Sequence, residues 1–271
     1  MQHSTNTAPN RHAELVTLIQ KYDRAYYQKS APLVSDAEYD RLRQELIALV
    51  AEYPELVTID SPTQNIGSAP EAGFQKYTHG QMMLSLDNAF DAQDVTDFIK
   101  KIKRFLHLDE SADLSFIAEP KIDGVSANLR YEQGQLVIGA TRGDGTTGEV
   151  ITANLKTITD IPHTLKGKAP DVIEIRGEVY MPLAEFAEMN KKRAEAGESI
   201  FANPRNSASG ALRQLDPQIT AKRPLYFFAY GMGENSGLSL KTHQDFLSQL
   251  QDWGFVVNPF HENCHTLKEM L

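Results

Sequence analysis

The sequence predicts an α+β fold, in which a helical hairpin at the N-terminus precedes a larger unit of helices and antiparallel sheets. Two patterns carry this prediction. Apolar residues recur at helical spacing over residues 11–53, whereas from residue 115 they alternate with polar residues, which is the period of a strand. The composition agrees with a folded protein. Of the 271 residues, 41% are hydrophobic and 23% are charged, which suffices for a packed core and excludes a wholly disordered chain.

Residues 11–53 are expected to form the two helices of the hairpin. The apolar stripe of the first helix comprises Leu15, Leu18, Ile19, Tyr22 and Tyr26, and that of the second comprises Tyr39, Leu42, Leu46, Leu49 and Val50. Residues 30–35 interrupt the pattern. Ser35 and Glu38 are spaced as a capping box at the start of the second helix, which Pro54 ends.

The remaining elements follow a linker. Residues 54–75 contain Pro, Ser, Gly and Thr without a period, which is typical of a connection between folded units. Helices are expected near 91–106, 182–195 and 242–252, and strands at 115–118, 125–131, 136–138, 172–180 and 225–232. We interpret the basic run at 100–104 as a solvated helix face rather than a nucleic-acid patch.

Composition excludes several classes of protein. No apolar run approaches the ~18 residues of a membrane span, and the N-terminus lacks a signal peptide, so we expect a cytoplasmic protein without membrane attachment. The single cysteine, Cys264, excludes a disulfide scaffold and a cysteine-cluster zinc site. With 27 Lys+Arg and 36 Asp+Glu the net charge is −9, which argues against binding nucleic acid by bulk charge alone.

The segment Glu119-Pro-Lys121-Ile-Asp123-Gly124 is the first candidate for chemistry. A lysine at the mouth of a sheet can act as a nucleophile once burial or a nearby cation favours its neutral form. Gly124 would let the backbone approach a ligand closely. Taken alone the pattern is weak, because a surface lysine beside a turn-forming Asp-Gly should occur in roughly one chain in twenty.

Three further segments carry polar residues suited to a nucleotide. Arg142 lies in a glycine-rich loop at 140–149 that could bring a guanidinium to a phosphate or ribose, although a hairpin turn would look the same. Residues 174, 176 and 178 place Glu, Arg and Glu on one strand face, which is either solvated or lines a pocket. Arg205 and Arg213, near a helix start, suit phosphate binding or a plain capped helix.

The hairpin also has a polar flank. Asp36, Tyr39, Asp40 and Arg43 lie beside the apolar stripe of the second helix, where tyrosines of the first helix could face them. Aromatic rings and carboxylates together suit a cationic ring. A helix-capping aspartate beside core tyrosines is the structural alternative.

Taken in order, these segments resemble the N-terminal part of bacterial NAD-dependent DNA ligases. The resemblance runs from about residue 11 to the C-terminus, and its strongest segments are SDAEYDRL (35–42), DSPTQNIG (60–67), MLSLDNAF (83–90), EPKIDG (119–124), ATRGDGTTGE (140–149), RGEVY (176–180) and NPRNSASGALRQLD (203–216). It implies a helical domain over residues 1–68 that binds nicotinamide mononucleotide (NMN), followed by a nucleotidyltransferase, or adenylation, domain over residues 69–271.

The resemblance also implies residue roles. Lys121 would attack the α-phosphorus of NAD, release NMN and hold AMP, while Asp123 would orient Lys121. The residues implied in cofactor binding are Tyr26, Asp36, Ala37, Glu38, Tyr39 and Asp40 for NMN, Ser85, Leu86 and Glu119 for adenine, and Arg142 and Glu178 for ribose. Arg205 and Arg213 would contact phosphates of AMP or DNA. Magnesium or manganese would neutralise the departing phosphate, with no protein ligand for the metal assigned.

Two departures from the family pattern are expected to limit the chain. The D-G-V-V-I-K motif of the adenylation domain is absent, as are the family's OB-fold, zinc finger, helix-hairpin-helix and BRCT domains. We therefore expect a fragment that ends inside the adenylation domain and cannot seal nicks by itself. In the full-length protein the partner would be nicked double-stranded DNA, and we expect a monomer located with the nucleoid.

Two rival functions remain open from the sequence. Another lysine nucleotidyltransferase, such as an ATP-dependent ligase or an RNA capping enzyme, would use the same lysine, but ATP has no nicotinamide for the hairpin to bind. A catalytically incomplete module that binds NAD or adenine nucleotides is the second rival. Retention of both Lys121 and Asp123 speaks against this module, and the missing C-terminal motif speaks for it.

Overall fold

The protein is described from a computed structural model. The described residues are 8–23, 25, 33–57, 62 and 73–271, with the backbone alone for Asp36. Tyr26 and the predicted boundary between residues 68 and 69 lie outside the described residues, so the division of the chain into two domains stays a prediction.

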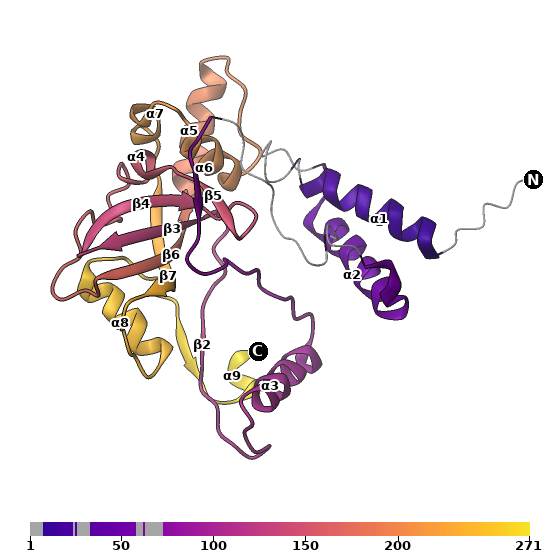
Figure 1. Ribbon diagram of the computed structural model, residues 1–271. Helices are drawn as coiled ribbons and strands as arrows, with labels where there is room; N and C mark the ends of the chain where they lie inside the picture. The colour runs from indigo at the N-terminus through magenta and orange to yellow at the C-terminus, as the bar shows by residue number, and fades with distance from the viewer. Residues whose placement is uncertain (1–7, 24, 26–32, 58–61, 63–72) are drawn as a thin grey trace, which may run out of the picture.

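The N-terminal hairpin is formed by helices α1 (Ala8–Asp23) and α2 (Asp36–Glu52), and the short 3-10 helix η2 (Pro54–Leu56) follows (Figure 1). The predicted stripes meet between the helices, where the buried side chains are Leu15, Ile19, Leu42 and Leu46. The Ser35 side chain caps α2 by accepting from the Glu38 backbone N–H at 3.3 Å. The Glu38 carboxylate pairs with Arg41 at 2.8 Å, so only the Ser35 half of the predicted capping box is observed.

The larger unit is built on a four-stranded antiparallel sheet in the order β4-β3-β6-β7. Its strands are β3 (Val125–Glu132), β4 (Gln135–Thr141), β6 (Val172–Tyr180) and β7 (Tyr226–Asn235). Two short antiparallel pairs lie beside it. They join β1 (Lys76–Thr78) to β5 (Thr147–Glu149), and β2 (Phe116–Ala118) to β8 (Glu262–Cys264). The predicted antiparallel α+β architecture is thus confirmed.

Helices pack on the sheet and build the main core (Figure 1). They are α4 (Thr152–Leu155), α5 (Leu183–Glu195), α6 (Pro204–Leu212), α7 (Pro217–Ala221) and α8 (His243–Trp253). Helices α3 (Ala92–Phe105) and α9 (Leu267–Met270) lie beside each other, away from this sheet. The core combines one face of β3 and β6 with apolar side chains of α6 and α8, among which Trp253 and Leu212 are about 1% exposed. Among the described residues, no helix has the length and apolar character needed to span a membrane.

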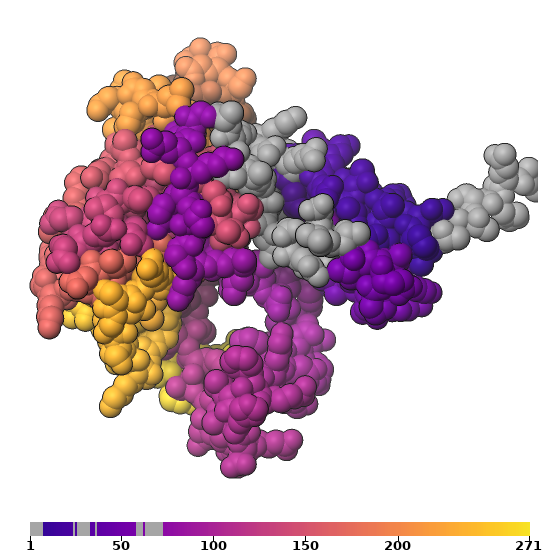
Figure 2. Space-filling model, viewed as in Figure 1, coloured from indigo at the N-terminus to yellow at the C-terminus, as the bar shows by residue number. Residues whose placement is uncertain are grey.

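The opposite face of the sheet is polar, yet it is also covered. On β6, Glu174 and Glu178 are 0% and 7% exposed, as buried as many core residues on the other face. The segment that follows β1 lies over this face, and Arg176 donates to the carbonyl of Met82 at 3.2 Å. Figure 2 shows the covering segment running across the surface of the sheet unit. The polar residues of β6 therefore line an interior site rather than a solvated face.

Candidate active site

The connection between β2 and β3 carries Lys121, whose side chain is exposed. Gly124 brings this connection against the end of β6. A Cβ atom at Gly124 would meet the backbone oxygen of Val179 and would lie 2.9 Å from Cγ of Glu178. Since only glycine permits this approach, Gly124 sets the distance between the lysine segment and the polar face of the sheet.

Glu178 is the centre of a cluster of charges. Ser126 Oγ donates to Glu178 Oε2 at 2.8 Å, and Arg205 Nη1 lies 4.0 Å from Oε1. Burial raises the pKa of Glu178, and the Ser126 hydrogen bond and the positive charges of Arg205, Lys121 and Arg142 act against that rise. Three predicted site residues from three separate segments, Lys121, Arg142 and Arg205, therefore act on one buried carboxylate.

Arg205 connects the cluster to the lysine segment. It lies in the first turn of α6, which begins where the Asn203 side chain accepts from the Asn206 backbone N–H at 2.8 Å. Its Nη1 is 3.6 Å from Oδ1 of Asp123, a carboxylate with 69% exposure. One guanidinium thus lies within 4.0 Å of both Asp123, two residues after Lys121, and Glu178.

Glu119 and the loop after β1 lie around the same connection. Glu119 Oε2 is 3.2 Å from His243 Nε2 at the start of α8. In the loop, Ser85 is partly buried and the Leu86 side chain is 75% exposed. The loop is held in place by the Met83 backbone N–H, which donates to the carbonyl of Gly145 at 2.8 Å. An exposed leucine on an anchored loop offers an apolar surface for a planar ring.

Arg213 has a different environment from Arg205. Its Nε lies 3.3 Å from Oε2 of Glu149, a carboxylate with 2% side-chain exposure on β5. In this arrangement Arg213 balances a buried charge and ties the end of α6 to β5. The phosphate contact expected of Arg213 stays a prediction.

The hairpin meets the cluster through Asp23. Tyr39 Oη donates to Asp23 Oδ1 at 2.7 Å. Burial raises the pKa of Asp23, and this rise is opposed by the Tyr39 hydrogen bond and by the charges of Arg43 and Arg142. Because Arg142 belongs to the loop after β4, the end of α1 lies within electrostatic reach of that loop.

The other hairpin residues are only partly placed by the structure. Asp40 lies on α2 with a partly exposed side chain, Ala37 is exposed, and Glu38 is engaged by Arg41. Tyr26 and the side chain of Asp36 lie outside the described residues. The assignment of this flank to NMN stays a prediction.

Sequence reasoning missed three residues of the cluster. Tyr230 on β7 lies close to Glu178, where burial and then that carboxylate raise the pKa of the phenol to about 12, against a hydrogen bond with Ser126. Asp23 and Ser126 are the other two. The alternation in β7 could have indicated Tyr230, since it shares a strand face with Phe228, which pairs with Glu178.

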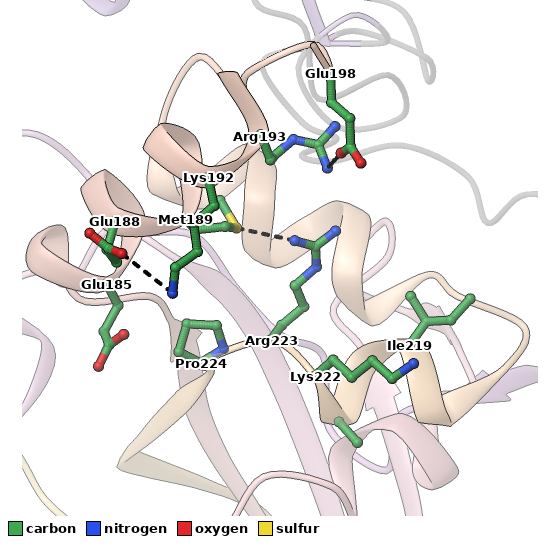
Figure 3. A pocket seen from close by; sticks show the side chains of 11 residues that line it. Glu185, Glu188, Met189, Lys192, Arg193, Glu198, Ile219, Lys222, Arg223 and Pro224 are labelled. Carbon is green, nitrogen blue, oxygen red and sulfur yellow. Dashed lines mark hydrogen bonds and ion pairs between the residues drawn. The ribbon is translucent and has the colours of Figure 1, made fainter. Parts of the chain in front are cut away.

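A separate hollow of about 700 Å³ lies between α5 and residues 219–224 (Figure 3). Charged side chains in its lining pair with each other, Lys192 with Glu188 at 3.3 Å and Arg193 with Glu198 at 2.8 Å. None of the residues around Glu178 lines this hollow. Within the part of the chain that the structure describes, no group of three or more His, Cys, Asp or Glu side chains is arranged to hold a metal ion.

On this antiparallel sheet, a buried carboxylate lies beside a lysine segment and two arginines. This arrangement is typical of a nucleotidyltransferase site. The family model of the NAD-dependent DNA ligase adenylation domain matches residues 71–271, and that of the DNA ligase-like N-terminal NAD+-binding domain matches residues 5–67. The chain belongs to the NAD-dependent DNA ligase family, as the resemblance predicted. This membership favours NAD over the ATP-dependent rivals.

Curated relatives agree with the family match. The chain is 54% identical to a DNA ligase of Parvibaculum lavamentivorans over 97% of its length, 52% identical to one of Nitrobacter hamburgensis over 96%, and 53% identical to one of Jannaschia sp. over 99%. These alignments cover 37%, 37% and 36% of the respective relatives. The chain therefore spans little more than a third of the length of these ligases.

Proposed function

We propose that this chain carries the NAD-binding and lysine-adenylation part of a DNA ligase. The observation that carries the proposal is the cluster around Glu178, in which Lys121, Arg142 and Arg205 act on one buried carboxylate. Positive charge gathered beside the lysine segment stabilises the negative charge of a phosphate under attack.

In the proposed reaction, Nζ of Lys121 forms a bond to the α-phosphorus of NAD as the bond to the NMN phosphate oxygen breaks. NMN leaves with the bonding electron pair, and the lysine, having lost its proton, holds AMP as a phosphoramidate. Asp123 orients Lys121, and the contact of Asp123 with Arg205 at 3.6 Å supports this role because it restrains the carboxylate beside the lysine. The adenylyl group then passes to the 5′-phosphate of nicked DNA in the whole protein.

The adenosine half of NAD would lie over the polar face of the sheet. Glu178 is suited to accept hydrogen bonds from ribose hydroxyls, with Arg142 beside it, because its carboxylate is already oriented by Ser126. Leu86 and Ser85 would contact the adenine ring from the loop, and Glu119 would accept from its amino group.

The NMN half would lie against the hairpin. The nicotinamide ring of NAD is cationic, so aromatic rings and carboxylates attract it. Tyr39 and Asp40 project from α2, and the preceding positions Asp36, Ala37 and Glu38, with Tyr26, complete the proposed contact surface. The proximity of Asp23 to Arg142 supports this arrangement, because it brings the hairpin to the loop that would hold the adenosine.

A divalent cation, Mg²⁺ or Mn²⁺, is proposed to accompany the nucleotide. The carboxylates of Glu119 and Asp123 flank Lys121 and are oxygen donors of the type that Mg²⁺ binds, although this ion keeps most contacts to water and phosphate. When bound, the cation would neutralise charge on the phosphates.

The chain alone is proposed to bind adenine nucleotides and to self-adenylate slowly. Lys121 is exposed, so the side chain that would attack the nucleotide is open to water. Removing one preorganised donor from a site of this kind costs about 10²–10³ in rate, and the family's D-G-V-V-I-K motif is absent. Binding of nicked duplex by the chain should be weak at net charge −9, with a Kd on the order of 10⁻⁴–10⁻⁶ M near physiological salt.

The test is a mass-shift assay with Mg²⁺ and either NAD or ATP, on this chain and on a longer one that includes the family motif. We expect covalent AMP to form with NAD and not with ATP, and to form much faster on the longer chain. Lys121→Ala should abolish the adduct. Equal labelling by ATP would refute the assignment of NAD. Equal rates for both chains would refute the need for the missing motif.

A second candidate is a module that binds adenine nucleotides without catalysis, and the exposure of Lys121 favours it. In that case both chains would bind AMP and neither would form an adduct. For the whole protein, we propose that it acts as a monomer in the cytoplasm, with the nucleoid, where its DNA substrate lies.

A further inference from the structure

His79 lies directly beneath the loop that carries Arg142. It is 6% exposed, and its backbone N–H donates to the carbonyl of Thr146 at 2.9 Å. Its ring Nε2 is 3.1 Å from the backbone oxygen of Arg142. The ring occupies space that Gly148 leaves open, since a Cβ there would approach Nε2 to 3.2 Å and would collide with the carbonyl of Thr141.

The neighbours of the ring determine which nitrogen carries the proton. Asn128 Nδ2 lies 3.1 Å from His79 Nδ1. The Asn128 side chain also lowers the pKa of the nearby Glu174 carboxyl, as expected when the amide nitrogen is turned toward the carboxylate, and an N–H of the same amide then points at Nδ1. Nδ1 is therefore an acceptor, and Nε2 carries the proton that is donated to Arg142.

The surroundings also keep the ring neutral. Burial lowers the pKa of His79, and the nearby charge of Arg176 acts in the same direction, whereas the Arg142 carbonyl and the Glu174 carboxylate oppose it. The ring of Tyr77 packs edge-on, with centroids 5.6 Å apart. If Nδ1 carried a proton, that proton would face an N–H of Asn128, and two donors repel each other. Rotating the Asn128 amide by half a turn would instead place its oxygen against the carboxylate of Glu174, which is also repulsive.

The bond from His79 is one of three hydrogen bonds made by the main chain of Arg142, and the Gly145 backbone N–H donates to the same carbonyl at 3.1 Å. The third runs from the Arg142 backbone N–H to the carbonyl of Ser126 at 3.3 Å, and the Ser126 hydroxyl in turn orients Glu178. A shift of the Arg142 carbonyl would therefore also move the Arg142 side chain, which lies near Glu178, the proposed ribose contact.

We infer that His79 is a positioning residue for nucleotide binding: as the neutral tautomer protonated on Nε2, it holds the Arg142 main chain in place through the hydrogen bond from Nε2 to the Arg142 carbonyl. This inference rests on the proposed function, because the role of Arg142 toward the nucleotide is assigned there. The charged groups that act on the ring are Glu174 and Arg176, and the phenol ring of Tyr77 packs against it.

Two substitutions separate the two ring nitrogens. In His79→Gln the amide nitrogen can replace Nε2 as donor to Arg142, whereas in His79→Asn the shorter side chain reaches only the position of Nδ1. We expect His79→Gln to bind AMP within about threefold of the parent chain at pH 7.5. His79→Asn should bind about tenfold more weakly, the loss typical of one hydrogen bond. Calorimetric titration with AMP measures both, and thermal unfolding shows that each variant is folded.

Recovery of affinity by glutamine but not by asparagine is a readout that a merely structural role would not give. Equal affinities of the Gln and Asn variants for AMP would overturn the inference.

Two measurements without nucleotide keep this inference separate from the proposed function. The ring ¹⁵N shifts of His79, assigned among the 8 histidines by comparison with His79→Gln, should report a proton on Nε2 at pH 7. Amide hydrogen exchange over residues 143–147 should be faster in His79→Asn than in His79→Gln. If the parent chain bound no AMP, the proposed function would fail, and these two measurements would still decide the role of His79. A proton on Nδ1, or unchanged exchange, would refute it.

Discussion

Replacing Gly124 by alanine tests the claim that close backbone contact positions the lysine segment. The new methyl group would overlap the carbonyl oxygen of Val179 and would come within 2.9 Å of Cγ of Glu178. The first of these atoms belongs to the main chain of the central strand pair β3·β6, so it cannot rotate away as the end of a side chain would.

The expected cost follows from two opposing effects. Alanine restricts the unfolded chain and so stabilises by about 0.4–1 kcal/mol. Overpacking costs about 1–3 kcal/mol, and contact with a backbone oxygen belongs at the upper end of that range. A net loss of about 2 kcal/mol should lower Tm by about 4–8 °C for a unit of this size. Displacement of Glu178 should also weaken AMP binding, by about tenfold or more.

Gly210→Ala is a matched control, since a Cβ there meets only Cε1 of Phe201 at 3.8 Å, inside helix α6. Alanine in a helix gains about 0.5–1 kcal/mol over glycine, so Tm should rise by about 1–4 °C. Circular dichroism melts and AMP titrations of both variants provide the measurements. If Gly124→Ala melted at or above the parent temperature, the steric argument for the lysine segment would be refuted.

Three further predictions concern charge. Arg213→Met should lower the free energy of unfolding in urea by about 2–4 kcal/mol, because it removes the cation 3.3 Å from the buried Glu149. Arg205→Met should mainly weaken AMP binding. Equal losses of stability in the two variants would contradict this contrast. Asp23→Ala and Tyr39→Phe should each destabilise by about 1–2 kcal/mol, and a double-mutant cycle with additive effects would exclude a coupled pair. Because the pKa of Glu178 is raised in the folded protein, its protonated form contributes stability below about pH 4.5, and this stability is lost as the pH rises through the pKa of the folded state. Glu178→Gln should remove this pH dependence from urea midpoints measured between pH 4.5 and 7. Parallel profiles of the parent and the variant would refute the prediction.

Local patterns predicted the elements well because the physics behind them is local. The stripes of α1 and α2 and the cap at Ser35 depend on neighbours in the sequence. The helix α3 was predicted correctly, yet its apolar side chains do not join the core: Phe105 is 80% exposed. Periodicity reports which face is apolar but not whether another element covers it.

The site was harder to predict because its contacts are distant in sequence. The face of β6 could be solvated or lined for a ligand, and the choice depends on a segment about 90 residues earlier, whose carbonyls accept from Arg176. Lys121, Arg142, Glu178 and Arg205 could be named only from combined motifs and a family resemblance. Asp23, His79, Ser126 and Tyr230 carried no motif, and only the folded arrangement shows what they contact.

The pairing of β2 with β8 has a consequence for the order of events on the ribosome. The strand that leads into Lys121 bonds to Glu262–Cys264, which are synthesised about 140 residues later. At about 5–20 residues per second, the nascent lysine segment waits roughly 7–30 s before its partner strand emerges. The sheet order β4-β3-β6 can form in that interval, so the polar face is expected to assemble first and the nucleophile to be fastened beside it afterwards. A stalled chain ending before residue 262 should accordingly show a protease-resistant sheet and a cleavable connection around Lys121.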